Sequence, residues 1–151
     1  MSEIIALAAD HGGYELKNAI KRHLEEKGIV CRDFGTNSSA SVNYPDYAHP
    51  LCEAVASGEC RLGILVCGTG IGMSMAANKH RGIRAACCSD TYSARLTREH
   101  NDANVLCLGG RVVGEGLALD MTDLFLSTPF AGGRHQARVD MLNALDDGKQ
   151  A

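Results

Sequence analysis

One cysteine of this sequence stands between an apolar stretch and a run of glycines. Cys67 is followed by Gly68-Thr69-Gly70-Ile71-Gly72, which opens a segment of helical periodicity. Glycines at this spacing let successive backbone N–H groups point at one small anionic group, and the positive end of a helix favours the same charge. Such surroundings also lower the pKa of a thiol toward neutrality. Cys67 is therefore a candidate nucleophile or proton acceptor, with a buried structural thiol as the alternative.

Two nucleotide-binding interpretations of this glycine loop fail. The Gly-x-Gly-x-x-Gly pattern counted from Gly68 needs glycine where Met73 stands, and counted from Gly70 it needs glycine where Met75 stands. A Walker A loop needs Gly-Lys-Ser or Gly-Lys-Thr, which this segment lacks. The loop therefore does not predict a dinucleotide or nucleoside triphosphate site.

A carboxylate and an imidazole follow another apolar stretch. Asp10 and His11 precede Gly12-Gly13, and a helical segment starts immediately afterwards. Because ligands of open parallel sheets bind at the carboxyl ends of the strands, we expect Asp10, His11 and Cys67 at one edge. The structural alternative makes Asp10 a helix N-cap and His11 a surface residue.

Two polar clusters stand later in the chain. Arg98-Glu99-His100-Asn101-Asp102 ends a predicted helix, where such a cluster taken alone is typical of a solvated terminus. Arg134 and Arg138 share one face of a helix and are able to clamp a phosphate, although solvated arginines are the commoner case. Arg111 adds a guanidinium after the last predicted strand.

The composition is that of a folded domain. The 151 residues, 45% apolar and 22% charged, fit one hydrophobic core, so we expect a single domain, 1–151. With a net charge of -3 the protein has no overall positive potential to attract a nucleic-acid backbone, so no nucleic-acid partner is expected. No apolar run approaches the roughly 20 residues that span a bilayer, and the N-terminus lacks signal-peptide features. We therefore expect a cytoplasmic protein with no membrane partner.

The seven cysteines do not form a disulfide or zinc pattern. Their number is odd and no two fall at Cys-x-x-Cys spacing, which argues against a disulfide framework and against a thiolate metal site. Taken one at a time, most are expected to be buried small apolar residues.

Apolar runs alternate with segments of helical period, which is typical of parallel strands covered by helices on both faces. Predicted strands span Ile4–Ala8, Ile29–Asp33, Leu62–Cys67, Ile83–Cys88 and Val105–Leu108. Predicted helices span Tyr14–Lys27, Pro45–Ala56, Ile71–Lys79, Thr91–His100, Gly114–Leu126 and Gly133 to about Asp146. A closed eight-fold barrel needs about 250 residues, so we expect an α/β fold with an open, five-stranded parallel sheet in a three-layer sandwich.

Helix length limits which candidate residues meet. A helix of about ten residues from Thr91 to His100 carries the chain roughly 15 Å, from the carboxyl edge of the sheet to the opposite edge. We therefore expect His100 not to reach Cys67 of its own chain. If both serve one site, that site is completed across a subunit interface, most simply in a two-fold dimer.

Eight segments taken together resemble those of a known enzyme family. They are Ala9-Asp10-His11-Gly12-Gly13, Asp33-Phe34-Gly35-Thr36, Tyr44-Pro45-Asp46-Tyr47-Ala48, Cys67-Gly68-Thr69-Gly70-Ile71-Gly72, Ala76-Ala77-Asn78-Lys79, Gly82-Ile83-Arg84-Ala85, Arg98-Glu99-His100-Asn101-Asp102 and Gly132-Gly133-Arg134-His135. In order and spacing they closely resemble the type B ribose-5-phosphate isomerases, whose family also holds galactose-6-phosphate and allose-6-phosphate isomerases. The resemblance runs from about Glu3 to about Ala144 without a large gap.

The resemblance implies a metal-independent aldose–ketose isomerase with a Rossmann-like sheet, no cofactor and a sugar-phosphate substrate. It also implies a homodimer, or a tetramer of dimers, with active sites shared across the interface. Cys67 matches the base that moves a proton between C1 and C2, and the loop from Gly68 to Gly72 matches the one that holds the enediolate oxygens. His100 of the neighbouring subunit matches the ring-opening residue, and Asp10 matches the aspartate on the sugar hydroxyls. The positions that match phosphate ligands are His11, Arg111, Arg134 and Arg138.

Three further residues are expected to contact substrate. We expect Thr69 to pass a proton between the two oxygens, and Tyr44 and Asn101 to contact the sugar. One branch of the family replaces the cysteine by serine and takes its base from a glutamate a few residues later. Because Cys67 is present and Met73-Ser74-Met75 offer no carboxylate, this chain resembles the cysteine branch.

The preferred substrate and the function class keep alternatives. Family members often carry tryptophan where Asn37 stands, so ribose 5-phosphate competes with a six-carbon aldose phosphate or a free rare sugar. A non-catalytic sugar-phosphate-binding subunit is a second alternative. A thiol redox protein is a third, although no second cysteine lies close to Cys67 in sequence.

Overall fold

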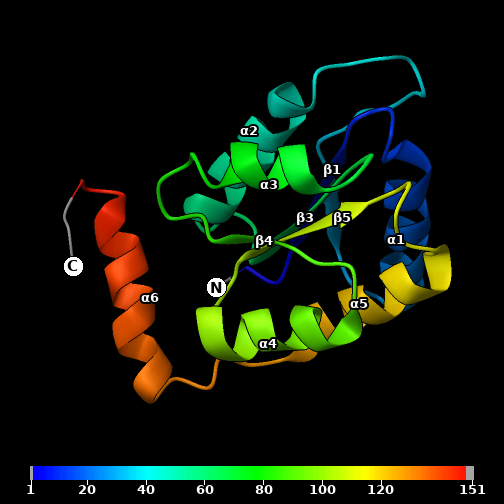
Figure 1. Ribbon diagram of the computed structural model, residues 1–151. Helices are drawn as coiled ribbons and strands as arrows, with labels where there is room; N and C mark the ends of the chain where they lie inside the picture. Colours follow the sequence, from blue (N-terminus) through cyan, green and yellow to red (C-terminus); the bar gives the residue numbers. More distant parts are fainter. Residues whose placement is uncertain (1, 149–151) are drawn as a thin grey trace.

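Five parallel strands form one sheet in this computed structural model, which describes residues 2–148. The strands are β1 (Ile5–Ala9), β2 (Cys31–Asp33), β3 (Leu62–Cys67), β4 (Ala85–Cys87) and β5 (Val105–Gly109). Their order across the sheet is β2-β1-β3-β5-β4 (Figure 1). The predicted domain limits, 1–151, include residues 1 and 149–151, which lie outside the described residues.

Helices cover both faces of the sheet. They are α1 (Tyr14–Glu26), α2 (Tyr44–Ala56), α3 (Ile71–Ala77), α4 (Thr91–Asn101), α5 (Glu115–Ser127) and α6 (Arg134–Leu145). Helices α2 and α3 pack on one face, whereas α1, α4 and α5 pack on the other (Figure 1). The predicted α/β fold, a three-layer sandwich around a five-stranded parallel sheet, is confirmed.

The inner strand β1 shows how the two cores form. Successive side chains of a strand point to opposite faces of the sheet. Ile5 and Leu7 pack with α1, α4 and α5, whereas Ala6 and Ala8 pack with α2 and α3. Every residue of β1 is buried, which explains why this strand is a continuous apolar run instead of an alternating one.

The two outer strands are shorter than predicted. Strand β2 begins at Cys31, not at Ile29, and β4 covers Ala85–Cys87, not the longer apolar run from Ile83. Each outer strand has one neighbour, β1 for β2 and β5 for β4. Ile29 and Ile83 precede the paired residues, and the backbone N–H of Ile83 bonds to the carbonyl of His80 in a turn. Their apolar side chains extended the predicted strands beyond the real pairing.

Helix α3 also ends two residues earlier than the predicted Lys79. The Asn78 side chain donates to the Ala85 carbonyl at 2.9 Å and accepts from the Ala85 N–H at 2.8 Å. These two bonds tie the end of α3 to the outer strand β4.

Helix α6 lies at one end of the molecule, beside α4 (Figure 1). Val139 is buried, but Met141, Leu142 and Leu145 are about half exposed. Within residues 2–148, no helix combines the length and the apolar character that crossing a membrane requires.

The order of the strands places a topological switch point between β1 and β3. From β1 the chain continues outward to β2, and from β3 it continues toward β4 on the other side. In open α/β sheets, ligands bind at the carboxyl ends of strands where the direction reverses in this way. Asp10 follows β1 and the glycine loop follows β3, so both stand at this switch point.

Candidate active site

The glycine loop curls over the Cys67 sulfur. The backbone N–H of Gly70 donates to Cys67 Sγ at 3.1 Å, and the Cys67 side chain is buried. Gly70 has φ of 80°, and a Cβ there would lie 2.9 Å from the Leu108 carbonyl carbon. Only glycine fits this left-handed, crowded position. The loop therefore brings a backbone donor to the sulfur through its glycine.

The segment after β5 supports the same loop. Gly110 N–H donates to the Cys67 carbonyl at 2.8 Å, and Arg111 N–H donates to the Gly68 carbonyl at 3.0 Å. The Arg111 guanidinium lies against Gly68, because a Cβ on Gly68 would be 3.2 Å from Arg111 Nη1. A cation from β5 thus flanks the loop that starts at β3.

Asp10 organises the loop after β1. Its Oδ1 accepts hydrogen bonds from Gly12 N–H at 2.8 Å and from Gly13 N–H at 3.2 Å, and the residue is 7% exposed. The N-cap position of α1 is Gly13, so the alternative of Asp10 as N-cap is wrong, although Asp10 does cap the preceding turn. A Cβ on Gly12 would lie 3.0 Å from Gly68 N, so the loops after β1 and β3 touch.

The chain after β1 comes even closer to β3 at the next residue, Gly13. A Cβ on Gly13 would lie 2.4 Å from both the carbonyl carbon and the carbonyl oxygen of Val66. The residue before α1 therefore packs directly against the backbone of β3 at Val66.

Three further side chains lie near the contact between the loops after β1 and β3, namely those of Tyr44, His11 and Thr69. A Cβ on Gly72 would lie 2.7 Å from the Tyr44 ring, so the ring covers the start of α3. His11 Nδ1 accepts the backbone N–H of Val42 at 3.2 Å, which holds the segment between β2 and α2 against the loop after β1. Thr69 Oγ1 accepts the N–H of Ile71 at 3.2 Å.

The structure thus brings one group of predicted site residues together at the carboxyl edge of the sheet. We call it the carboxyl-edge cluster, and it consists of Asp10, His11, Tyr44, Cys67, Gly68, Thr69, Gly70, Ile71, Gly72 and Arg111.

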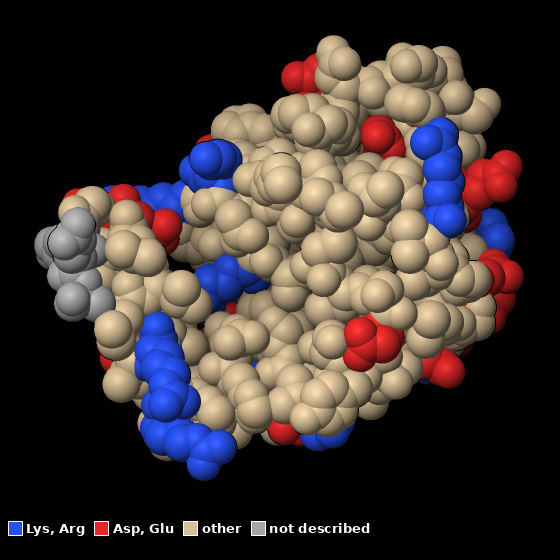
Figure 2. All heavy atoms as spheres, viewed as in Figure 1, with Lys and Arg blue, Asp and Glu red and all other residues tan. Residues whose placement is uncertain are grey.

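The remaining predicted site residues gather where α4 ends and α6 begins. They are His100, Asn101, Arg134 and Arg138, and together with His135, for which no role was predicted, we call them the α4–α6 cluster. The rings of His100 and His135 stack with centroids 4.1 Å apart. Figure 2 shows basic side chains along the surface of α6, whose only Lys or Arg residues are Arg134 and Arg138.

Positive charges in the α4–α6 cluster act on the pKa of His135. Desolvation lowers the pKa of His135, and the charges of His100, Arg134 and Arg138 lower it further, against an opposing effect of Glu99. A phosphate group is the kind of ligand that would relieve this crowding of positive charge.

The two clusters lie at different edges of the sheet. Helix α4 starts after the carboxyl end of β4 and leads to the amino end of β5, which is parallel to it. His100 therefore stands at the amino edge, away from the glycine loop after Cys67. The described chain assembles two partial sites, not one.

The sequence alone suggested that Arg98 is solvated at the end of a helix, but the structure shows that it is buried. It is 8% exposed, and its Nη1 donates to Asp102 Oδ1 at 2.8 Å and to the Ala103 carbonyl at 2.6 Å. Its Nε donates to the Thr128 carbonyl at 3.3 Å. Arg98 is a structural residue that ties the end of α4 to the chain before α6.

The other thiols differ from Cys67 in their surroundings. Burial raises the pKa of Cys52 to about 12 and the pKa values of Cys31 and Cys88 to about 11. Five of the seven cysteines are buried, which confirms the expectation for most of them, whereas Cys31 is half-buried and Cys87 is exposed.

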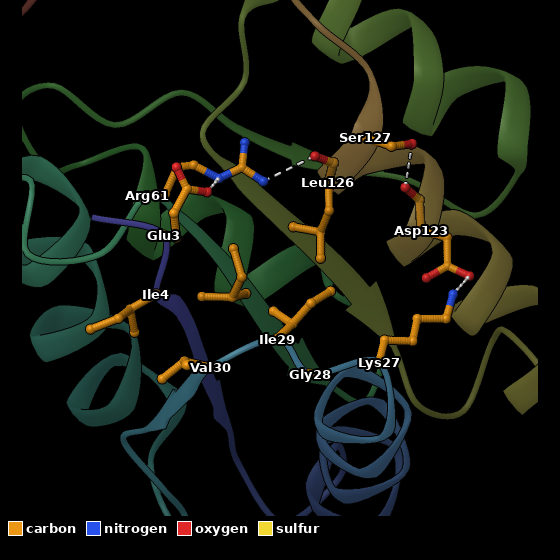
Figure 3. Close-up of a pocket in the computed structure, with 11 residues that line it drawn as sticks. Glu3, Ile4, Lys27, Gly28, Ile29, Val30, Arg61, Asp123, Leu126 and Ser127 are labelled. Atoms are coloured by element: carbon orange, nitrogen blue, oxygen red, sulfur yellow. Dashed lines mark hydrogen bonds and ion pairs between the residues drawn. The ribbon is translucent and has the colours of Figure 1, made fainter. Parts of the chain in front are cut away.

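A hollow of about 490 Å³ belongs to neither cluster. Figure 3 draws the residues that line it. Its apolar floor includes Ile4, Ile29 and Leu126, and Arg61 and Lys27 stand at its rim, each beside a carboxylate. It opens at the amino end of β1, opposite the carboxyl-edge cluster. Across residues 2–148, no three His, Cys, Asp or Glu side chains group as metal ligands do.

The sequence analysis missed two contacts that shape the carboxyl-edge cluster. One is the bond from Val42 to His11, for which no sequence signal exists. The other is a buried Lys17 that bonds to Asp33 at 2.9 Å and to the Thr36 carbonyl at 2.6 Å. A signal for the second existed, because Lys17 shares a helical face with the buried Ile20 and Leu24.

The fold and the carboxyl-edge cluster define an α/β enzyme with a thiol and a glycine-rich loop at the switch point of its sheet. The chain belongs to the family described as Ribose/Galactose Isomerase, whose profile matches residues 5–142. It is an aldose–ketose isomerase of sugar phosphates, as the resemblance implied.

Individual relatives match along almost the whole chain. Ribose-5-phosphate isomerase B of Escherichia coli (strain K12) is 51% identical over 142 residues, which cover 94% of this chain and 95% of that protein. The structure of ribose-5-phosphate isomerase B from Clostridium thermocellum has a TM-score of 0.95 and 52% identity, covering 96% and 98% of the two chains. That of Mycoplasma genitalium ribose-5-phosphate isomerase B with bound ribulose-5-phosphate has a TM-score of 0.93 and 41% identity, covering 99% of each.

Proposed function

We propose that the protein interconverts ribose 5-phosphate and ribulose 5-phosphate through a cis-enediol, with Cys67 as the base. The observation that carries this proposal is the 3.1 Å hydrogen bond from Gly70 N–H to Cys67 Sγ, because a backbone donor stabilises negative charge on the sulfur. The similar Escherichia coli protein is a ribose-5-phosphate isomerase, and the similar Mycoplasma genitalium structure holds ribulose-5-phosphate.

The proton moves along one face of the open-chain sugar. The Cys67 thiolate removes the proton from C2 of the aldose, and the electron pair forms the C1–C2 double bond while O1 becomes negative. Thr69 carries a proton from O2 to O1, and the Cys67 thiol then returns its proton to C1 to give the ketose. N–H groups of the glycine loop face the charge on oxygen, and each such donor contributes about 2.7 to 4 kcal/mol in the transition state.

The sugar and its phosphate engage both clusters. Asp10, Tyr44 and Asn101 contact the sugar, and His100 opens the furanose ring. Four cations or donors hold the phosphate, namely His11, Arg111, Arg134 and Arg138. Binding energy from this remote group holds the reacting carbons beside the thiol.

A second copy of the chain completes the site. Since the α4–α6 cluster stands at the other edge of the sheet from Cys67, the neighbouring subunit of a two-fold homodimer supplies it. The half-exposed Met141, Leu142 and Leu145 on α6 support such a partner, because exposed apolar residues that gather on one helix mark interaction surfaces. Pairing of dimers gives the tetramer that the resemblance also allows.

The remaining expectations complete the proposal. The chain acts as one sugar-phosphate isomerase domain in the cytoplasm, without metal or cofactor. The thiol and the loop amides supply the proton transfer and the oxyanion stabilisation that a metal ion supplies elsewhere.

Incubation with ribose 5-phosphate in D₂O tests the reaction. We expect a ketose absorbance, with deuterium at C1 of the ketose, because the proton held by Cys67 exchanges with solvent. A ketose without deuterium would contradict a thiol-bound proton that exchanges with solvent before it is returned to C1. No ketose at all would favour a binding subunit, and thiol–disulfide exchange without isomerisation would favour a redox protein.

A six-carbon aldose phosphate is the second candidate substrate. Asn37, a small residue in the exposed part of the loop before α2, leaves room where a larger side chain would limit sugar length. A panel of kcat/KM values over five- and six-carbon aldose phosphates, with the free sugars as controls, separates the two candidates.

A further inference from the structure

A lysine ammonium is buried beneath the carboxyl-edge cluster. Lys17 on α1 is 1% exposed, and its Nζ donates to Asp33 Oδ1 at 2.9 Å and to the Thr36 carbonyl at 2.6 Å. Taking two charges out of water costs free energy, and replacing a buried ion pair by apolar residues is often neutral or stabilising. The pair is therefore poor evidence of a contribution to stability, and its geometry needs another explanation.

The buried pair fixes the start of the segment between β2 and α2, residues 34–43, which we call the β2–α2 loop. Asp33 Oδ1 also accepts the N–H of Gly35 at 2.9 Å. The Gly35 carbonyl accepts the N–H of Ala9 at 2.6 Å, and the Thr36 N–H donates to the Ala9 carbonyl at 2.7 Å. Lys17 thus holds the loop against the residue that precedes Asp10.

The other end of the β2–α2 loop fixes His11. The N–H of Val42 donates to His11 Nδ1 at 3.2 Å. A ring nitrogen that accepts a hydrogen bond carries no proton, so the neutral ring has its proton on Nε2. Nε2–H is then a donor that is free to meet a phosphate oxygen.

We propose that Lys17 is a positioning residue for the substrate phosphate, because it anchors the β2–α2 loop that sets the tautomer and orientation of His11. The inference rests on the proposed function, in which His11 binds the phosphate. Lys17 acts through Thr36 and Val42 and does not touch the substrate.

Two variants separate positioning from stability. Lys17→Met removes the donor to Thr36 and leaves the Asp33 charge with only the partly exposed Lys21, whose Nζ lies 3.4 Å away. The double variant Lys17→Met/Asp33→Asn removes both charges, which relieves the unpaired charge but does not restore the donor to Thr36. We expect KM for ribose 5-phosphate to rise about tenfold in both variants, with kcat within about threefold of wild type.

Nitrogen-15 NMR of the histidine rings gives a readout that does not depend on activity. Wild type is expected to show His11 as the Nε2–H tautomer, and both Lys17 variants a mixture of tautomers. Lys21→Met is the matched control, since Lys21 contacts Asp33 but not the loop, and we expect wild-type KM and a wild-type His11 spectrum.

A folded double variant with wild-type KM and a pure Nε2–H tautomer would overturn the proposal. If neither variant folds, Lys17 acts through stability and the proposal is equally overturned. Failure of the proposed function is distinct, because a wild-type protein without isomerase activity would still show whether Lys17 controls the His11 tautomer.

Discussion

The imidazole rings of His100 and His135 stack with an interplanar angle of 13° and centroids 4.1 Å apart. The contact joins the end of α4 to the start of α6, and the Ala131 N–H bond to the Glu99 carbonyl at 3.0 Å reinforces it. Arg134 and Arg138 are thereby carried beside His100 as a unit. In the proposed function, one protomer thus presents the ring-opening group and two phosphate-binding groups together, which makes the shared-site arrangement directly testable.

Mixed dimers test the sharing. A Cys67→Ala chain and a His100→Ala chain are each expected to be inactive as homodimers. In a shared-site heterodimer one of the two sites is intact, so a one-to-one mixture should recover about a quarter of the wild-type activity after subunit exchange. Mixing two batches of the same variant is the control. Recovery no greater than in the control would place both residues in one chain's site.

Loss of the α6 arginines should weaken binding of the phosphate. Arg134→Gln and Arg138→Gln are each expected to raise KM for ribose 5-phosphate about 10- to 100-fold, because each removes a hydrogen bond between charged groups. Arg32→Gln, which breaks the exposed ion pair with Glu59, is the matched control and should keep wild-type KM. Steady-state kinetics give the KM of each variant. An unchanged KM would show that α6 does not bind the phosphate.

Removal of the thiol should stop turnover without loss of binding. Cys67→Ala is expected to lower kcat by about 10²- to 10⁴-fold, the usual contribution of a general base, with KM within about threefold of wild type. Cys31→Ala is the control, because that thiol lies on β2 and burial raises its pKa to about 11. The rate of ketose formation is measured for both variants. Near-normal turnover by Cys67→Ala would exclude the sulfur as the base.

Ionisation of Asp33 should make the free energy of unfolding depend on pH in the acid range. Burial alone would raise the pKa of Asp33, but hydrogen bonds from Lys17 and Gly35 and the charges of Lys17 and Lys21 lower it below its ordinary value. A lowered folded-state pKa adds stability that is present above the unfolded-state pKa, near 4, and is lost as pH falls through the folded-state pKa. Urea unfolding should therefore show the difference between wild type and Asp33→Asn shrinking below about pH 4.

The control for acid dependence is Asp120→Asn, which changes an exposed carboxylate on α5. Its free energy of unfolding should follow the wild-type pH curve. At neutral pH, Asp33→Asn should cost about 3 to 5 kcal/mol, because it weakens the pairing of the buried Lys17 ammonium. A constant difference between Asp33→Asn and wild type across the whole pH range would contradict the lowered pKa.

Chelation should leave the reaction intact. In the proposed mechanism the thiol and the loop amides carry the chemistry, so dialysis against EDTA is expected to leave kcat/KM unchanged. Metal content by mass spectrometry and activity are measured on the same sample. Loss of activity that zinc or magnesium restores would show that a metal ion takes part.

Strand positions in the middle of the sheet follow from the sequence, whereas its edges and its order do not. β1, β3 and β5 are buried on both faces, so their apolar runs match the observed strands to within one residue. Ile29 and Ile83 are equally apolar, yet no neighbouring strand pairs with them. The pairing of β1 with β3 joins distant segments, and no local pattern encodes it.

The candidate site divides in the same way. Asp10 and Cys67 were predictable because each follows a strand directly, and parallel topology brings strand ends together. The burial of Lys17 had a sequence signal, its place on the apolar face of α1, but its two partners did not, because a lysine in an amphipathic helix normally reaches solvent. Only the three-dimensional structure shows that the Thr36 carbonyl and Asp33 meet its ammonium.

The contact between Gly13 and Val66 restricts how the carboxyl-edge cluster can be widened. There is no space for even a methyl group between Gly13 and Val66. A larger residue there would push α1 and β3 apart and move the loops that carry Asp10 and Cys67. Accommodation of a longer carbon chain must therefore come from the opposite wall, where Tyr44 and the β2–α2 loop stand. Libraries aimed at new sugars should vary that wall and keep both glycines of the Gly12-Gly13 pair.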